Sequence, residues 1–178
     1  MRIIDREGIT MKFKSIKPQE ISSNIFEAVG EKWMLITGGD KAGFNTMTAS
    51  WGGAGILWQR PVTFCFVRPQ RFTRGFMDAG DHFTLSFYGE EYRPQLNIAG
   101  IDSGRDGDKV AKMGFTPAFA DCGAAYFEEA ELVLVCKKIY FDDFKPANFL
   151  APDIEKMYKD GDYHRMYIGE IIEVLKKD

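Results

Sequence analysis

The chain has 178 residues, of which 45% are hydrophobic, 28% charged and 14% aromatic. This length and composition predict one globular domain, 1–178, and exclude a disordered chain, because so many apolar side chains can offset the entropy of ordering. The formal net charge of -3 gives no global positive field to hold a polyanion. Nucleic acid is therefore not an expected partner.

The three cysteines, Cys65, Cys122 and Cys136, are odd in number and widely spaced, and the chain has only two histidines. This pattern favours neither a disulfide framework nor a metal site. The charged first residues are not typical of a signal peptide, and no stretch approaches the roughly 20 apolar residues that a membrane helix needs. We therefore expect a cytoplasmic protein with no membrane partner and no bound metal.

Strand-like segments dominate the chain. In the segment 62–67, Val62, Phe64 and Phe66 share one face, which is the period-two pattern of a strand. The segment 132–136 is apolar on both faces, which indicates a strand covered on both sides. The predicted strands are 33–37, 45–51, 62–67, 83–88, 130–141 and 166–174.

Helical patterns are fewer and shorter than the strands. The predicted helices are 18–27, 71–78, 91–99, 108–113 and 153–157. They do not alternate regularly with the strands as in βαβ units, and the GxGxxG fingerprint of a Rossmann fold is absent. The sequence therefore predicts a mainly β fold, an antiparallel β-barrel with inserted helices.

The least ordinary stretch is NTMTASWGG, residues 45–53. In an extended strand, Thr46, Thr48 and Ser50 would form a row of hydroxyls on one face. Two glycines follow, where a backbone can approach a ligand closely. The pattern is equally typical of a solvent-facing strand that ends in a glycine turn, because threonine is common in strands.

A second stretch, RPQRFTR at residues 68–74, holds three arginines at intervals of three. It follows an apolar strand and opens a predicted helix, with Pro69 near the helix start, where its missing N–H costs nothing. Guanidinium groups beside free backbone N–H groups suit a phosphate. The alternative is a set of solvated arginines paired with nearby carboxylates.

A third stretch places His164 at the head of the last predicted strand, in DYHRMYIGE. A lone histidine lacks the partners that a metal needs, so we consider it a hydrogen-bond donor that lines a cavity. The alternative is a structural histidine.

Taken together and in this order, NTMTASWGG, RPQRFT, FTLSF and YHRMYIGEI resemble the flavin reductase family, within its flavoredoxin-like branch. The resemblance extends from about residue 33 to 174. It implies the FMN-binding split barrel, a Greek-key antiparallel fold, with FMN held at a homodimer interface. The implied cofactor-binding residues are Asn45, Thr46, Met47, Thr48, Ala49, Ser50, Trp51, Arg68, Arg71, Thr73, Ser86 and Phe87.

The roles of these residues follow from the same resemblance. The segment 48–51 would contact the isoalloxazine ring and the ribityl chain. Arg71 and Thr73 would contact the phosphate, and Ser86 and Phe87 would flank the ring. His164 would act on the substrate side. The segment 98–126 is an insertion that varies among such proteins, and the resemblance assigns it no role.

The function that the resemblance implies is that of an NAD(P)H:flavin oxidoreductase. Electrons from NADH or NADPH would pass through FMN to a flavin, a metal complex, oxygen or a protein. Two alternatives remain, because a fold does not fix a function: a non-enzymatic FMN-binding electron carrier, and an enzyme similar to pyridoxine-phosphate oxidase.

Overall fold

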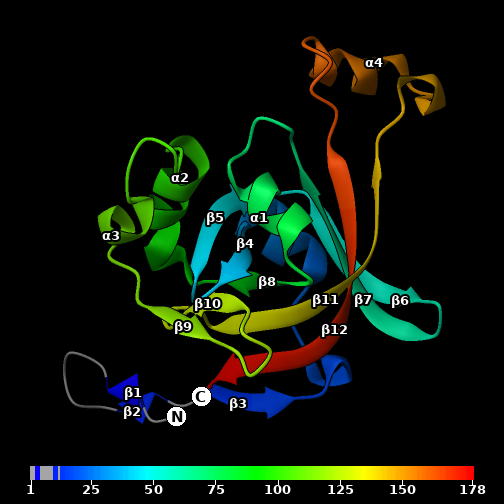
Figure 1. The fold of residues 1–178 in the computed structure, drawn as a ribbon. Coiled ribbons are helices and arrows are strands. Elements are labelled where there is room, and N and C mark those ends of the chain that lie inside the picture. Colours follow the sequence, from blue (N-terminus) through cyan, green and yellow to red (C-terminus); the bar gives the residue numbers. More distant parts are fainter. Residues whose placement is uncertain (1–2, 5–9, 12) are drawn as a thin grey trace.

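The computed structural model describes residues 3–4, 10–11 and 13–178, and its main feature is an eight-stranded antiparallel sheet (Figure 1). Its strands are β3 (Phe13–Ile16), β4 (Met34–Asp40), β5 (Gly43–Ala49), β6 (Gly52–Leu57), β7 (Arg60–Val67), β8 (His82–Phe87), β11 (Leu132–Asp143) and β12 (Arg165–Lys177). Two smaller antiparallel pairs are β1 (Ile3–Ile4) with β2 (Thr10–Met11) and β9 (Pro117–Phe119) with β10 (Ala125–Phe127).

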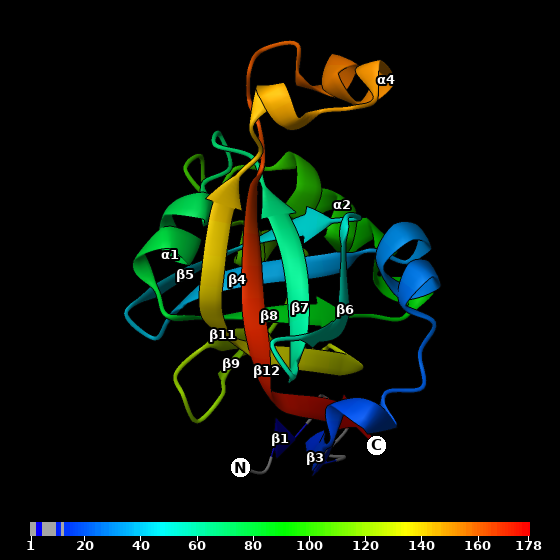
Figure 2. The ribbon, with the colours of Figure 1, turned by 90° about the vertical axis from the view of Figure 1, so that its right-hand side faces the viewer.

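The order of the strands is β5-β4-β8-β11-β12-β7-β6, with β3 beside β12. β8 follows β7 in the chain, but β11 and β12 lie between them in the sheet, so the connection crosses over as in a Greek key. β11, β12 and β7 cross the group of β4, β5 and β8 at a steep angle (Figure 2). This arrangement confirms the predicted mainly β, antiparallel split-barrel fold.

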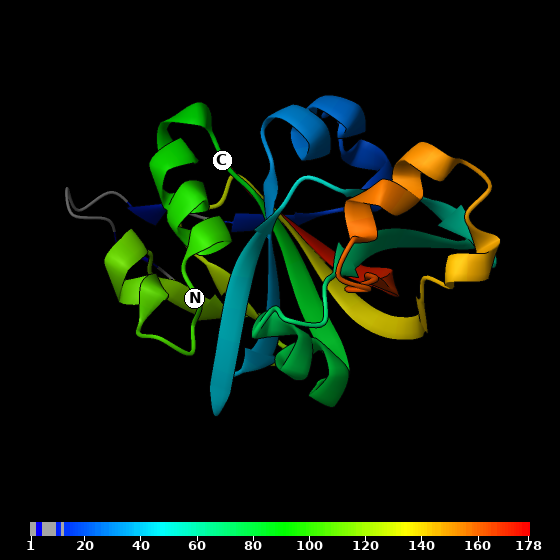
Figure 3. The ribbon, with the colours of Figure 1, turned by 90° about the horizontal axis from the view of Figure 1, so that it is seen from above.

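The helices are α1 (Thr73–Ala79), α2 (Arg93–Ile101), α3 (Lys109–Met113) and α4 (Pro152–Glu155). Short 3₁₀ segments cover Pro18–Glu20, Glu90–Tyr92, Pro146–Asn148 and Lys156–Tyr158, and a π-helical turn covers Glu27–Glu31. Seen from above, α2 and α3 lie on one side of the sheet and α4 on the other (Figure 3). No helix in the described part of the chain is long and apolar enough to cross a membrane.

The central strand β11 is buried on both faces, as its sequence predicts. Leu134 and Cys136 join one apolar core together with Phe83 of β8. Val133 and Val135 face the opposite way and join a second core beneath α2 and α3. Because both faces of the sheet are covered here, the strand reads as a continuous apolar run.

The second core gives the insertion 98–126 a structural role. Met113, Phe115 and Ala118 are buried in it and pack around Phe127 and Val133. The insertion thus supplies the layer that covers one face of the sheet. Its first part also carries the end of α2, which reaches the candidate site described below.

The predicted helix 18–27 is wrong. A 3₁₀ turn at Pro18–Glu20 is closed by the Glu20 carboxylate, which accepts from the Lys17 amide at 2.7 Å. The Asn24 side chain then accepts from the Phe26 amide at 3.0 Å. Such side-chain bonds to nearby backbone groups compete with a continuous helix, and the chain turns helical only near Glu27–Glu31.

The predicted strand 45–51 also needs correction, because β5 ends at Ala49. The chain turns at Ser50 and Trp51, and the two glycines, which the alternative interpretation placed in a turn, begin β6 instead. Gly53 pairs with Phe64 of β7, and a Cβ there would lie 2.6 Å from the Phe64 ring. A side chain at this position would have to displace that ring, so cross-strand packing favours glycine in this segment.

The segment 144–164, here called the arm, connects β11 to β12 and contains α4. It stands off the barrel (Figures 1 and 2). Its inner side is aromatic, with Tyr158 stacked on Tyr163 at 4.9 Å between ring centroids. Its outer side exposes apolar residues, among them Leu150 at 96%.

Candidate functional site

A hollow of about 170 Å³ opens where β5 ends and where β7 runs into α1, with the base of the arm beside it. Here and below it is called the hollow. It is lined by Met47, Thr48, Ala49, Ser50, Trp51, Phe66, Arg68, Arg71 and His164. Three stretches that are far apart in the sequence thus meet at one place, and each of them contains residues predicted to form a site.

Phe66 is the lining residue that the sequence prediction missed. It belongs to β7, whose inner residues Cys65 and Val67 are fully buried. Its outer neighbour Phe64 is 37% exposed. The signal was present in the alternation of 62–67, because an aromatic residue on the less buried face of a strand beside a predicted site is a candidate for the wall of that site.

The row of hydroxyls on β5 exists, but its members are engaged within the protein. The Thr46 hydroxyl donates to the Ile36 carbonyl at 3.2 Å and lies 2.9 Å from that of Thr37. The Thr48 hydroxyl donates to the Leu96 carbonyl of α2. The hydroxyl of Ser50, in the turn after the strand, makes no hydrogen bond to the described residues, so it is the one in this row that is free to meet a ligand.

Asn45 and Thr73 connect β5 to the start of α1 rather than lining the hollow. Asn45 Nδ2 donates to Thr73 Oγ1 at 2.7 Å, and both residues are buried. Thr73 is not among the residues that line the hollow, and the direct phosphate contact that the resemblance implies stays a prediction. The pair instead fixes the position of α1 against the strand.

Arg71 is the half-buried cation of the hollow. Its Nη1 donates to the Gly100 carbonyl at the end of α2 at 2.6 Å. No carboxylate in the described part of the chain forms an ion pair with it. Burial and, to a smaller degree, the nearby Arg68 lower its pKa.

Arg68 has a different environment. Its Nη1 pairs with the Asp162 carboxylate, and its Nη2 donates to the Met157 carbonyl at 3.2 Å. The guanidinium also lies over the Tyr158 ring, 5.2 Å from the centroid. Gln70 adds a hydrogen bond to Asp162 at 2.8 Å. Through these contacts Arg68 holds the arm. This agrees with the alternative interpretation, in which the arginines pair with nearby carboxylates.

His164 lies at the base of the arm, directly before β12, and is only 7% exposed. Its ring centroid is 5.0 Å from that of Trp51, and its Nδ1 lies 2.9 Å from the Tyr158 hydroxyl oxygen. Burial, with a smaller contribution from Arg68, lowers its pKa to about 4. The imidazole is therefore neutral at pH 7 and carries one N–H.

Ser86 and Phe87 lie away from the hollow. Ser86 sits in the middle of the sheet, opposite Leu35 and Val133, and is fully buried. Phe87 lines a separate apolar groove with Ile21 and other residues. β8 is a central strand between β4 and β11, and neither residue is among those that line the hollow, so the structure does not bring these two residues to it.

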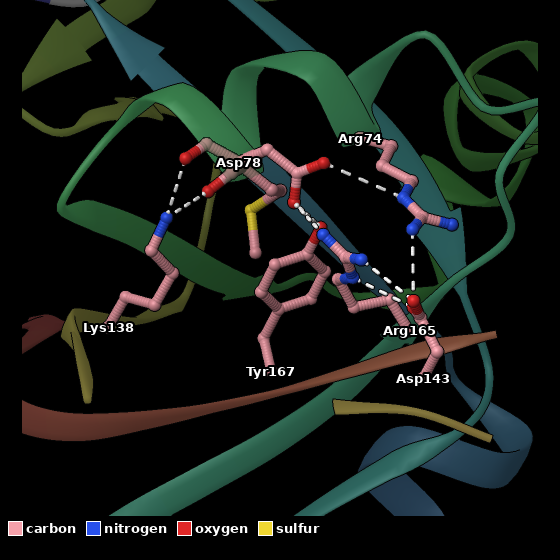
Figure 4. Close-up of polar contacts among 7 residues, drawn as sticks. Arg74, Asp78, Lys138, Asp143, Arg165 and Tyr167 are labelled. Atoms are coloured by element: carbon pink, nitrogen blue, oxygen red, sulfur yellow. Dashed lines mark hydrogen bonds and ion pairs between the residues drawn. The ribbon is translucent and has the colours of Figure 1, made fainter. Parts of the chain in front are cut away.

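A polar cluster fixes α1, and with it the loop that carries Arg71, to the sheet (Figure 4). Arg165 of β12 bridges Asp143 at 2.7 and 2.8 Å and Asp78 of α1 at 3.1 Å. The pKa of Asp143 is lowered mainly by Arg165. The cluster comprises Arg74, Asp78, Lys138, Asp143, Arg165 and Tyr167.

Within residues 3–4, 10–11 and 13–178, no group of three or more His, Cys, Asp and Glu side chains is placed to hold a metal ion. The hollow offers two guanidinium groups, the Ser50 hydroxyl, a neutral imidazole, aromatic rings and a backbone turn.

The flavin reductase like domain family matches residues 26–178 of the chain. The chain belongs to this family. The match runs from the π-helical turn to the end of β12 and so includes all of the hollow, and it confirms the resemblance drawn from the four motifs. No curated protein matches the chain.

Solved structures of flavin reductase-like proteins share the fold. An FMN-binding domain of a flavin reductase-like enzyme from Shewanella baltica superposes with a TM-score of 0.69 at 15% identity, covering 94% of this chain and 78% of that chain. Flavoredoxin of Desulfovibrio vulgaris gives 0.63 at 24% identity, covering 89% and 75%. An NADH:FAD oxidoreductase from Streptomyces globisporus gives 0.61 at 15% identity, covering 82% and 74%.

Proposed function

We propose that this member of the flavin reductase-like family is an FMN-dependent oxidoreductase that takes electrons from NADH or NADPH and passes them to a flavin, a metal complex, oxygen or a protein. The observation that carries the proposal is the combination found in the hollow. Arg71 supplies a positive charge that no carboxylate of the described residues pairs with, and His164 supplies a neutral imidazole beside Trp51 of the exposed backbone turn.

The residues of the hollow fit one side of FMN. A phosphate suits Arg71, because a guanidinium with one nitrogen already bound to Gly100 keeps further N–H groups for a charge-assisted pair. The planar ring suits the turn at Ser50 and Trp51, where the side chain of Trp51 is 41% exposed. Bound FMN would supply the hydride-accepting chemistry, and the protein its orientation and electrostatic environment.

The side chains have separate tasks in this proposal. Arg71 binds the phosphate. The Ser50 hydroxyl and the backbone of 48–51 contact the ring and the ribityl chain. His164 donates a hydrogen bond to the reductant. None of them needs to act as a strong acid or base. Orientation of the reductant is the larger effect, because misplacement of a reacting group by about 1 Å can cost about a hundredfold in rate.

The size of the hollow supports a homodimer. Ligand sites usually have a volume of about 300–1,000 Å³, and the hollow has about 170 Å³, so one chain encloses only part of FMN.

Apolar side chains are exposed along the β6 and β7 hairpin and the adjoining part of β11: Ile56, Leu57, Trp58, Phe64, Tyr140 and Phe141. Aromatic residues are enriched in interface cores. Light scattering should give twice the mass of the 20.2 kDa chain, and a monomer with FMN fully bound would contradict the proposal.

A non-enzymatic electron carrier is the second candidate. The exposed apolar side of the arm, beside the hollow, would suit the docking of a protein partner. The exposed Trp51 favours the reductase instead, because it leaves the face of the turn accessible to a nicotinamide. An enzyme similar to pyridoxine-phosphate oxidase would differ from both in oxidising a pyridoxine phosphate with oxygen.

Anaerobic stopped-flow reduction of the FMN-loaded protein tests the proposal. NADH or NADPH should reduce the flavin, and His164→Ala should slow that step by about a hundredfold while FMN affinity and reduction by dithionite stay unchanged. His82→Ala is the matched control, because His82 is the second histidine and lies at the start of β8, outside the hollow. Failure of both nucleotides to reduce the flavin would reject the reductase and leave the carrier.

A further inference from the structure

The arm carries a tyrosine, Tyr158, whose hydroxyl contacts His164, a residue that lines the hollow. Tyr158 is 4% exposed, and its hydroxyl oxygen lies 2.9 Å from Nδ1 of His164. In the described residues, this nitrogen is the only hydrogen-bond partner of the Tyr158 hydroxyl. Nε2 of His164 has no protein partner there and is not among the buried unpaired polar atoms. The imidazole is thus held at one nitrogen and open at the other.

Pairing of the two groups fixes the direction of the hydrogen bond. A phenol has one O–H to donate, and a neutral imidazole has one nitrogen that donates and one that accepts. If Nδ1 carried the proton, it would donate to the phenol oxygen and leave the buried Tyr158 O–H without an acceptor, which is unfavourable. The Tyr158 hydroxyl therefore donates to Nδ1, and the imidazole proton sits on Nε2.

Tyr158 is itself held in place. The Arg68 guanidinium lies 5.2 Å from the centroid of its ring and also pairs with Asp162 of the arm. The Tyr163 ring stacks against it at an interplanar angle of 25°, and Phe149 packs beside it. The position of the hydroxyl is therefore fixed by contacts from Arg68, which directly follows β7, and from both ends of the arm.

We propose that Tyr158 is a positioning residue that orients His164 as an Nε2–H donor facing the hollow, where it binds a carbonyl oxygen of the reductant, as the carboxamide of a nicotinamide offers. The proposal rests on the proposed function, because it names the atom through which His164 would act. It also assigns the arm a task in the site, with Arg68 supporting Tyr158 instead of binding the phosphate.

Nitrogen-15 NMR of the protein without nucleotide tests the tautomer directly. The chain has two histidines, so His82→Gln leaves one imidazole to assign. We expect Nε2 of His164 in the protonated range and Nδ1 in the unprotonated range at pH 7. Tyr158→Phe should reduce this preference and produce a population protonated at Nδ1. A spectrum of the wild-type protein with Nδ1 protonated would overturn the proposal.

Kinetics then separate positioning from structure. Tyr158→Phe should slow reduction by NAD(P)H by about 2- to 10-fold, the value of one net hydrogen bond, and leave FMN affinity and reduction by dithionite unchanged. Tyr163→Phe is the matched control, because Tyr163 stacks on Tyr158 but has no hydrogen bond to His164 in the described structure. Equal effects of the two variants would overturn the proposal.

The two experiments also distinguish this proposal from the proposed function. If His164→Ala leaves reduction unchanged, the donor role of His164 is rejected, and the assignment of Tyr158 as a positioning residue for the reductant is rejected with it. If His164→Ala slows reduction but the tautomer is insensitive to Tyr158→Phe, the proposed function stands and only the inference about Tyr158 is overturned.

Discussion

The two walls of the hollow are stabilised in different ways. The barrel wall, formed by β5 and β7, belongs to a sheet whose inner residues, such as Cys65, Val67 and Thr46, are fully buried. The arm wall is held by a few specific contacts: Arg68 with Asp162 and Met157, and Tyr158 with His164. Its outer face, at Leu150, lies in solvent.

This difference separates stability from function. Burial of apolar surface holds the barrel wall, so changes there should alter the free energy of unfolding of the whole protein. The arm wall depends on polar and aromatic contacts that single substitutions remove. Changes in the arm should therefore alter local opening and the reaction more than global stability.

Replacing one leucine in each region by alanine should give the largest difference in the free energy of unfolding. Leu134→Ala in β11 empties space in the core and should lower the free energy of unfolding by about 2–5 kcal/mol. Leu150→Ala in the arm removes a side chain that is already exposed, so we expect a change within about 0.5 kcal/mol. Urea unfolding of both variants measures the difference. Similar losses would show that the arm is part of the cooperative core.

Acid should weaken the arm wall through His164. The pKa of this group is about 4 in the folded protein and about 6.5 in an unfolded chain, so the unfolded chain binds the proton first as the pH falls. The contribution of His164 to stability is complete above pH 6.5 and is lost between pH 6.5 and 4, by up to about 3 kcal/mol.

The comparison with His164→Gln isolates this effect from the carboxylates that titrate in the same range. The free energy of unfolding of the wild-type protein should fall more steeply with acid than that of the variant. Parallel pH dependences of the two proteins would mean that folding does not lower the pKa of His164.

Removal of the guanidinium that holds the arm should have a smaller, local effect. Arg68→Met removes bonds to Asp162 and Met157, and a hydrogen bond to a charged group is worth about 1.5–3 kcal/mol. Hydrogen exchange of arm amides, such as that of Ile154, should quicken by about 10- to 100-fold with little change in the barrel. Lys145→Met is the control, because its pair with Asp142 is exposed. Unchanged exchange in Arg68→Met would show that other contacts hold the arm.

The sequence predicted the barrel well where the pattern depends on burial. The period-two pattern of 62–67 and the two-sided apolar run of 132–136 both correspond to observed strands, because side chains alternate between the faces of a sheet and a strand covered on both faces is apolar throughout. The sequence failed where local and tertiary effects compete. β6 reads as a glycine turn, yet pairing with β7 makes it a strand.

The candidate site was predicted in part for the same reason. Motifs in three stretches indicated the residues that meet in the hollow. They did not indicate which of these residues are engaged by other side chains and which are free to bind a ligand. Arg68 and Arg71 are equivalent in the sequence, and only the folded arm separates them by placing Asp162 beside Arg68. The role of Tyr158 was not visible, because its contact with His164 depends on the path of the arm.

The most direct test of the central claim, that Arg71 and the hollow bind FMN by its phosphate, is a titration of the apoprotein with FMN and with riboflavin. FMN should bind about 10- to 100-fold more tightly, the value of one charge-assisted contact. Arg71→Met should remove most of that difference, whereas Arg93→Met, which makes the same change in charge at the start of α2, should preserve it. Equal affinities of the wild-type protein for the two ligands would contradict the account.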